Sequence, residues 1–353
     1  MSGPGPEVAV VIPTYNQEKT LAACLESVYA QTYRPAEVIV VDDCSTDRTR
    51  EIARSFPCTL VALPTNRGPA AARNAGVAAA TAPLMFFLDS DTALLPDALA
   101  NAVQAYQDTP GCGMVQGIYA PQPLFDDGPV EAYRVLAEHL MRRRTTATLL
   151  SCSLIPKEVY LAAGGLDERL RDGEDFEFGT RLPAGYSLLV TDRVVTRADD
   201  VDRLLPLLRE HFTRSRSRPA RLLEAWRRRR LAPPSARAGA STARVTYLDG
   251  AGWVTSAATG LGLVTPLVAL LTPWALLAVP PLGLAFLAAN RELVTQARRL
   301  RGVRFAALTV ALHALTNAVF LLGVAAGLPA MARQALRRPS TARARAVAAE
   351  RRT

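Results

Sequence analysis

Two aspartates that follow an apolar run are the residues best suited to chemistry. Residues 84–88 read LMFFL and lead directly into Asp89, Ser90 and Asp91. An apolar run of this length predicts a buried strand, and ligands of open α/β sheets collect at the carboxyl ends of the strands. Two carboxylates at such an end are hard oxygen ligands that suit a divalent cation. Taken alone the pair is a weak signal, because such pairs also occur in ordinary turns.

Four other segments place polar side chains beside predicted elements. The run VVI is followed by Pro13, Thr14, Tyr15 and Asn16, and EVIVV is followed by Asp42 and Asp43. The segment NRGPAAARNAG carries Arg73 and Asn74, and GGLDERLRDGEDFEF carries Glu174 and Asp175. Three of them have a structural alternative: a cap for the next helix at Asp42 and Asp43, a solvated charge at Arg73, and a carboxylate favoured by the helix dipole at Asp175.

Alternating strands and helices are predicted to position these residues between 7 and 190. Apolar runs predict strands at 7–12, 37–41, 59–63, 84–88, 114–116, 149–155 and 186–190. Helical spacing predicts helices at 20–29, 45–56, 68–80, 96–106, 129–143 and 172–182. The first strand is expected to stop at Pro13, which has no N–H to donate, and Ser45 or Thr46 to cap the second helix. This alternation implies a mostly parallel sheet with helices on both faces.

The five motifs, in this order and spacing, resemble those of family 2 glycosyltransferases of the GT-A fold. The resemblance covers residues 6–190. It implies an α/β fold in which a GT-A type, mostly parallel sheet binds a nucleotide-sugar. By the resemblance, the donor is held by residues of the first four motifs: Pro13, Thr14, Tyr15, Asp42, Asp43, Arg73, Asn74, Asp89 and Ser90. Of these, Asp42 would hydrogen-bond the base and Arg73 would meet the pyrophosphate.

The same resemblance implies a divalent metal, Mg²⁺ or Mn²⁺, with Asp91 and Asp89 as ligands. It makes Asp175 the general base that deprotonates the acceptor hydroxyl, with Glu174 beside it. The physical requirements agree, since the leaving diphosphate needs its charge neutralised and the acceptor needs a base on the opposite face of the sugar. One base and no nearby nucleophile imply a single displacement with inversion.

The sequence departs from the family pattern in two places. Many relatives carry a histidine after the strand that follows the Glu-Asp motif, whereas this chain reads RVVTRADDVDRL. Asp199, Asp200 or water could take that place at the metal. The Gln-x-x-Arg-Trp signature of polymer-forming relatives is also missing, which favours transfer of a single sugar.

Charge divides the chain into an acidic body and two basic segments. The 353 residues are 49% hydrophobic and carry a net charge of +9. Ten arginines face two glutamates over 203–230, and seven arginines face one glutamate over 333–352. An anionic membrane surface is the expected partner of these segments. Nucleic acid is not, because no recognised nucleic-acid module accompanies them. The five cysteines include no CxxC pair, so neither a disulfide framework nor a zinc site is expected.

The C-terminal third is predicted to be a membrane region. Residues 250–290 contain no charged side chain, which predicts a hairpin of two spans at 251–271 and 273–289. A third apolar stretch covers 305–328, but a third crossing would put the basic tail outside, against the positive-inside rule. The N-terminus lacks the features of a signal peptide. We therefore expect a multi-pass protein of the inner (plasma) membrane with a cytoplasmic catalytic domain.

These patterns together predict four regions and one leading function. The regions are a GT-A catalytic domain over 1–200, a basic interfacial helix and linker over 201–249, transmembrane helices over 250–330 and a basic tail over 331–353. The leading function is inverting, metal-dependent transfer of one sugar from a nucleotide-diphospho-sugar, expected to be a UDP-sugar, to a lipid or polyprenyl-phosphate acceptor. The alternatives are a non-catalytic membrane scaffold with a degenerate transferase body and a nucleotidyltransferase.

Overall fold

The computed structural model describes residues 5–145, 147–231, 250–270 and 272–336. They divide into two compact units. The sheet unit contains the described residues up to Arg203 together with Arg291–Thr309. The helical unit contains the described residues of 204–232, 252–290 and 310–353.

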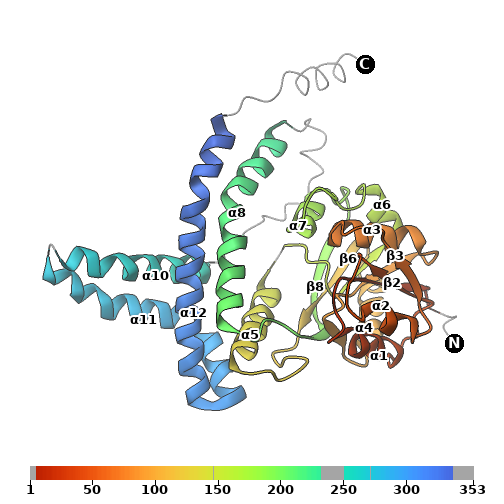
Figure 1. The fold of residues 1–353 in the computed structure, drawn as a ribbon, viewed down its shortest axis with the longest axis horizontal. Helices are drawn as coiled ribbons and strands as arrows, with labels where there is room; N and C mark the ends of the chain where they lie inside the picture. Colours follow the sequence, from red (N-terminus) through yellow and green to blue (C-terminus); the bar gives the residue numbers. More distant parts are fainter. Residues whose placement is uncertain (1–4, 146, 232–249, 271, 337–353) are drawn as a thin grey trace. The chain divides into compact units, whose positions relative to one another are not determined.

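A sheet forms the centre of the sheet unit (Figure 1). It has eight strands in the order β3-β2-β1-β4-β7-β6-β8-β5. The strands are β1 (Val8–Thr14), β2 (Glu37–Asp42), β3 (Thr59–Ala62), β4 (Leu84–Phe87), β5 (Thr92–Leu94), β6 (Cys112–Tyr119), β7 (Ser153–Pro156) and β8 (Ser187–Ala198). Strands β3, β2, β1 and β4 pair in parallel, and so do β6 and β8. Strand β7 is antiparallel to both β4 and β6, and β5 is antiparallel to β8. The predicted α/β sheet is confirmed, but it is mixed: four of the described strand pairs are parallel and three are antiparallel.

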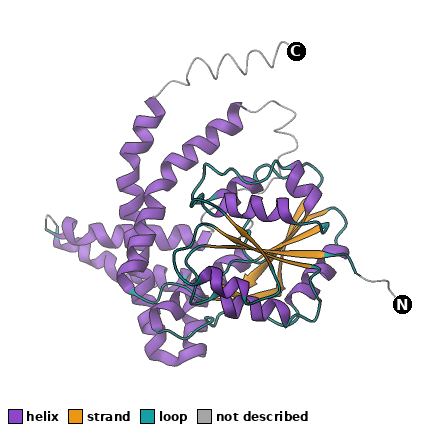
Figure 2. Cartoon of the chain, turned by 45° about the vertical axis from the view of Figure 1, so that its right-hand side comes forward, coloured by secondary structure: helices purple, strands orange, loops and turns teal. Residues whose placement is uncertain are grey.

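Helices cover both faces of this sheet (Figure 2). Apolar side chains of α1 (Leu21–Tyr29), α2 (Thr49–Arg54) and α4 (Ala98–Gln107) enter the core on one face. Those of α3 (Pro69–Ala79), α6 (Lys157–Ala162) and α7 (Glu174–Gly179) enter the core on the other. Helix α5 (Pro129–Arg144) follows β6. Because β1, β2 and β4 alternate their side chains between the two cores, both faces of these strands are apolar.

Strand β1 continues through Pro13, so the prediction that it stops there is wrong. Val11 accepts from the amide of Leu88, while Thr14 accepts from the amide of Asp43. In a parallel strand alternate residues bond to opposite neighbours, so Pro13 faces the side of β4. That strand has already ended at Phe87. The missing N–H of Pro13 therefore costs no ladder bond, and the strand carries Thr14 to its carboxyl end.

Three further features differ from the sequence-based expectations. Helix α2 begins at Thr49, and Ser45 does not cap it but accepts a hydrogen bond from the backbone N–H of Asn16 at 2.9 Å. The short strand β5 and the helix α6 were not predicted. Strand β8 runs on to Ala198, beyond the predicted end at 190. This longer strand brings Asp199 beside Asp91, whose carbonyl accepts from the Asp199 amide at 2.8 Å.

The helical unit is built from long helices. Its elements are α8 (Leu204–Leu231), α10 (Gly250–Ala269), the 3-10 helix η1 (Pro273–Ala278), α11 (Val279–Ala289) and α12 (Arg291–Leu336), whose first residues belong to the sheet unit. Helices α8 and α12 lie side by side (Figure 1), and a Cβ at Gly323 would stand 1.9 Å from the Ser215 hydroxyl oxygen. The predicted basic connector at 291–304 is helical, with a break at Gly302 (φ 82°).

One helix of the described residues, α12, is long and apolar enough to cross a membrane. The predicted hairpin at 251–271 and 273–289 contains shorter apolar stretches. They are Val254–Thr265 within α10 and Trp274–Ala289 within η1 and α11. Multiple crossings therefore stay a prediction. The predicted linker within 232–249 and the tail from 337 lie outside the described residues.

Candidate active site

The Asp89-Ser90-Asp91 motif follows β4 at the carboxyl edge of the sheet, as predicted. Asp89 accepts a hydrogen bond from Arg73 Nη2 at 2.7 Å. The Asp91 Oδ1 atom is buried and has no hydrogen-bond partner among the described residues. Burial and the negative charges of Asp89 and Asp200 raise the pKa of Asp91 to about 8. A buried carboxylate oxygen left without a partner, next to a second carboxylate, suits a hard divalent cation.

Arg73 of α3 joins the Asp89-Ser90-Asp91 motif to α7, the helix that carries Glu174 and Asp175. Its side chain is 8% exposed, and its Nη1 donates to Glu174 Oε1 at 2.8 Å while Nη2 binds Asp89. A planar guanidinium that binds two carboxylates from different elements fixes their separation. Both terminal nitrogens of Arg73 thus have carboxylate partners in this structure. The contact with a pyrophosphate stays a prediction, and the observed role of Arg73 is to hold β4 and α7 together.

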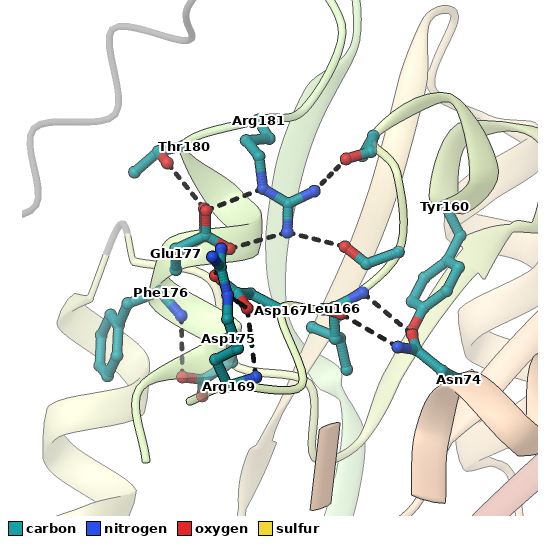
Figure 3. A network of polar contacts seen from close by, with 12 residues as sticks. Asn74, Tyr160, Leu166, Asp167, Arg169, Asp175, Phe176, Glu177, Thr180 and Arg181 are labelled. Atoms are coloured by element: carbon teal, nitrogen blue, oxygen red, sulfur yellow. Dashed lines mark hydrogen bonds and ion pairs between the residues drawn. The ribbon is translucent and has the colours of Figure 1, made fainter. Parts of the chain in front are cut away.

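Asp175 lies in the first turn of α7, next to the buried Glu174. Its Oδ1 accepts from the backbone N–H of Phe176 at 2.8 Å (Figure 3). Burial and the neighbouring charge of Glu174 outweigh Arg73 and raise the pKa of Asp175 to about 7. A carboxylate with a pKa near neutrality can accept a proton efficiently at physiological pH. The geometry is therefore compatible with a base at Asp175.

Asp42 and Asp43 shape the loops at the carboxyl end of β2. Asp42 accepts from the Ser45 amide at 3.2 Å and from Arg50 Nε at 2.5 Å. Asp43 accepts from the amides of Arg67 and Gly68, each at 2.7 Å. Both side chains are buried and already bonded. Recognition of a nucleotide base by these carboxylates stays a prediction, whereas the hydrogen bonds of Asp43 to the loop amides of Arg67 and Gly68 are observed.

The end of β1 offers groups that are still available to a ligand. Thr14 is buried, and its hydroxyl has no hydrogen-bond partner among the described residues. The adjacent Tyr15 side chain is 46% exposed. Pro13 and Ser90 are buried. An exposed aromatic ring beside an unsatisfied hydroxyl is suited to hold a planar, polar ring such as a nucleotide base.

The side chain of Asn74 holds a loop rather than an open pocket. Its Oδ1 accepts from the Tyr160 hydroxyl at 2.6 Å and from the Leu166 amide at 2.9 Å (Figure 3). Its Nδ2 donates to Leu166 O and to Glu168 Oε1, each at 3.0 Å. These four bonds use the capacity of the amide. Asn74 anchors the segment that leads to Asp175, and its predicted binding of the nucleotide-sugar stays a prediction.

Sequence reasoning missed a charged cluster beside Asp91. Ligand atoms of Asp127, Glu131 and Asp199 lie within 4.8 Å of one another. Lys19 Nζ donates to Asp127 Oδ2 at 2.5 Å and to Asp199 Oδ1 at 2.6 Å, so the cluster already contains a cation. These residues are up to 180 positions apart in the chain. No local spacing could have indicated the cluster.

The predicted substitutes for the family's metal-binding histidine are both engaged. Asp199 binds Lys19, and Asp200 lies 3.4 Å from Arg134 Nε and accepts from the Val201 amide at 2.7 Å. Asp200 nevertheless lies near enough to raise the pKa of Asp91. The identity of a third metal ligand stays open between Asp199, Asp200 and water.

Comparison with known proteins gives a consistent picture of the sheet unit. Residues 9–153 match the family model described as Glycosyl transferase family 2. An uncharacterized glycosyltransferase of Haemophilus influenzae is 28% identical over 232 residues, which cover 59% of this chain and 78% of that protein. The Escherichia coli UDP-Glc:alpha-D-GlcNAc-diphosphoundecaprenol beta-1,3-glucosyltransferase WfgD is 40% identical over 87 residues, covering 24% of this chain and 34% of WfgD.

Among solved structures, the mannosyltransferase PcManGT from Pyrobaculum calidifontis, in complex with GDP-Man and Mn²⁺, has a TM-score of 0.55. It is 21% identical, and the match covers 92% of this chain and 87% of PcManGT. This likeness shows the GT-A-like fold of eight strands followed by helices. Together with the family match, the comparisons support a glycosyltransferase.

Proposed function

We propose that this chain, a glycosyltransferase with a family 2 domain over residues 9–153, transfers one sugar from a nucleotide-diphospho-sugar to a lipid-linked acceptor with inversion. The observation that carries the proposal is the buried Arg73. It binds Asp89 of the metal-binding motif and Glu174, the neighbour of the base. Donor-binding carboxylate and base helix are thus held at one place by one guanidinium, as a single displacement requires.

A divalent metal fits the residues present. Asp91 offers a buried oxygen without a partner, and Asp89 offers a second carboxylate. We propose that these two hold Mg²⁺ or Mn²⁺, with PcManGT as the related fold whose structure includes Mn²⁺. When bound, the metal would supply positive charge to the diphosphate leaving group.

The chain's own residues have distinct tasks in this proposal. Tyr15 and Thr14 would hold the nucleotide base of the donor. Asp43 would keep the neighbouring loop at 66–68 in place. Arg73 would fix the distance between Asp89 and α7. Asp175 would take the proton from the acceptor hydroxyl as that oxygen attacks the anomeric carbon.

A membrane acceptor is supported by the apolar surface of the helical unit. Large side chains there are exposed, with Leu270 at 82%, Trp274 at 78% and Leu277 at 68%. Contiguous exposed apolar surface marks a membrane or protein contact, and α12 is long enough to span a bilayer. WfgD, by its name, acts on a diphosphoundecaprenol-linked sugar. We propose an acceptor of this lipid-linked class and a UDP-sugar donor.

The test is nucleotide release by membranes that contain the chain, with a panel of UDP-, GDP- and dTDP-sugars. We expect one donor to release nucleotide in the presence of Mn²⁺ and of a lipid extract. The Asp175→Asn variant is the catalytic control, because the amide nearly preserves shape but cannot accept the proton. Its turnover should fall about 10²–10⁴-fold, with donor affinity within about twofold of wild type. Release from no donor, or full activity of the variant, would overturn the proposal.

A further inference from the structure

The buried Arg142 is a positive charge that the proposed mechanism does not use. It lies near the end of α5, and its side chain is 8% exposed. Its guanidinium lies over the Tyr119 ring, 3.6 Å from the ring centroid. Burying a charged group is costly unless it is paired and hydrogen-bonded. The partners of Arg142 therefore decide how well its buried charge is compensated.

Those partners are few for a group with five N–H donors. Among the described residues, Nη1 donates to Ser151 O at 3.5 Å, and Nε has no hydrogen-bond partner. Its Nε forms a long ion pair with Glu138 Oε2 at 3.9 Å, and the other oxygen of Glu138 binds Arg134 at 2.6 Å. Burial favours the neutral form, but Tyr119, Glu138 and Asp89 outweigh burial and raise the pKa of Arg142. The guanidinium is therefore charged and under-coordinated.

The position of Arg142 separates it from the nucleotide end of the site. Thr14 ends β1 and Asp43 directly follows β2, and both strands lie on one side of β4 in the sheet. Tyr119 ends β6, and Ser151 precedes β7, which lie on the other side of β4. Asp89 of the metal-binding motif stands between, at the end of β4. Arg142 thus lies on the side of β4 away from the proposed nucleotide-base site. Its charge also acts on Asp175.

We propose that Arg142 binds a phosphoryl group of the acceptor, so that it is a specificity residue for a phosphate-bearing rather than a neutral acceptor. The inference rests on the proposed function and names the acceptor's chemistry more closely. A guanidinium matches phosphate oxygens with parallel N–H bonds, and a phosphate here would supply the partners that Nε lacks. The donor's own diphosphate is served by Asp89 and Asp91 through the metal, so Arg142 is left for a second anion.

The experiment uses the full chain purified in detergent and two soluble probes, citronellyl phosphate and citronellol. Binding of each probe is measured by calorimetry with the nucleoside diphosphate and Mn²⁺ present. We expect citronellyl phosphate to bind wild type and to bind Arg142→Gln at least tenfold more weakly. Arg142→Lys, which keeps a charge but not the fork of donors, should fall between them. Citronellol should bind all three alike.

The matched control is Arg143→Gln, which removes the same charge from the next position of α5. Arg143 is 41% exposed and lies 3.7 Å from Glu292, so its loss should leave the affinity for citronellyl phosphate within twofold of wild type. The KM for the donor, measured by nucleotide release, should be unchanged in both arginine variants. Thermal unfolding reports whether Arg142→Gln folds; if it does not, the Arg142→Lys variant decides.

Several results would overturn the inference. One is that citronellyl phosphate does not bind to wild type, and another is that the Arg142 and Arg143 variants bind it equally. A third is that the KM for the donor rises in Arg142→Gln while binding of citronellyl phosphate is unchanged. The last would assign Arg142 to the donor diphosphate. If wild type releases nucleotide from no donor, the proposed function fails, but the calorimetric comparison still decides whether Arg142 binds phosphate.

Discussion

Asp91 and Asp175 are carboxylates whose pKa values burial raises toward neutrality, to about 8 and about 7. For each the neighbouring negative charge adds to the effect of burial: Asp89 for Asp91, and Glu174 for Asp175. Such shifts are typical of sites where a group must bind a cation or accept a proton. They also make the reaction sensitive to pH in a range where ordinary carboxylates are fully ionised.

The pH dependence of turnover follows from Asp175. A base must be deprotonated, so we expect turnover to rise with pH through about 7, with the metal saturating. An aspartate with an unshifted pKa would place this rise in turnover, the acid limb of the pH profile, near pH 4. The Glu174→Gln variant removes the neighbouring negative charge, and the limb should then move to lower pH. The pH profile of kcat measures this shift, and a profile flat between pH 5 and 8 would contradict the assignment of Asp175.

The role of Asp91 is tested by Asp91→Asn. We expect transfer to fall by at least about 100-fold and the affinity for Mn²⁺ to drop. In metal-free buffer at pH 9 the variant should unfold at a temperature no lower than wild type, because it no longer buries a charged oxygen without a partner. Thermal unfolding beside a Mn²⁺ titration measures both effects. Full wild-type activity in EDTA would remove the metal from the mechanism.

The residue types at the site could be predicted from the sequence, but their partners could not. The LDSD and GED segments indicated Asp89, Asp91 and Asp175 because carboxylates after an apolar strand or at a helix start are local patterns. Arg73 was indicated as well, but not its contact with Glu174, 101 positions away. Lys19 and Arg142 gave no signal, since the ion pairs of Lys19 with Asp127 and Asp199 and the burial of Arg142 depend on tertiary structure alone.

At the scale of elements, the segment between α6 and α7 positions Asp175, the proposed general base. Asn74 of α3 binds Leu166 (Figure 3) and also Glu168. Arg181 of the following turn donates to the carbonyl of Gly165 at 2.7 Å. Gly165 has φ 65°, a conformation that glycine adopts without strain. The loop before α7 is thus fastened from both sides, which keeps Asp175 in place.

The Asn74→Ala variant should loosen this segment. Because four hydrogen bonds are lost, we expect the free energy of unfolding to drop by about 1–3 kcal/mol. Turnover should fall while the donor KM changes little, since the loop carries the base and not the nucleotide. Chemical denaturation and steady-state kinetics measure the two effects. The control is Asn101→Ala, which removes one hydrogen bond to Arg193 O. Equal effects of both variants would contradict the anchoring role of Asn74.

Elements were predictable where the pattern was local. The apolar runs indicated β1, β2 and β4, because both faces of these strands are buried. They indicated β3 as well, although its residues are half-buried or exposed. Strand β5 has three residues and exists only because β8 pairs with it. The extent of β1 past Pro13 depends on where β4 ends, which no sequence rule for proline contains.

At the scale of the whole molecule, the membrane prediction depends on residues 250–336. We expect a variant without 250–353 to leave the membrane fraction on carbonate extraction, whereas the full chain stays. Exposed arginines of α8, such as Arg209 and Arg214, should still hold the truncated chain to anionic vesicles at low salt. Fractionation and vesicle sedimentation at two salt concentrations measure this. A truncated chain that resists both carbonate and salt would contradict the assignment.

The division into two units has a consequence for biosynthesis. The sheet unit includes Arg291–Thr309, where Arg301 Nη2 donates to Asp126 at 2.6 Å and Glu292 binds Arg144. Leu293 and Ala297 of the same stretch are buried. A ribosome reaches these residues only after it has made α8, α10 and α11. The nascent sheet unit therefore stays incomplete while the apolar helices emerge from the ribosome. It gains its last contacts only when translation is nearly finished.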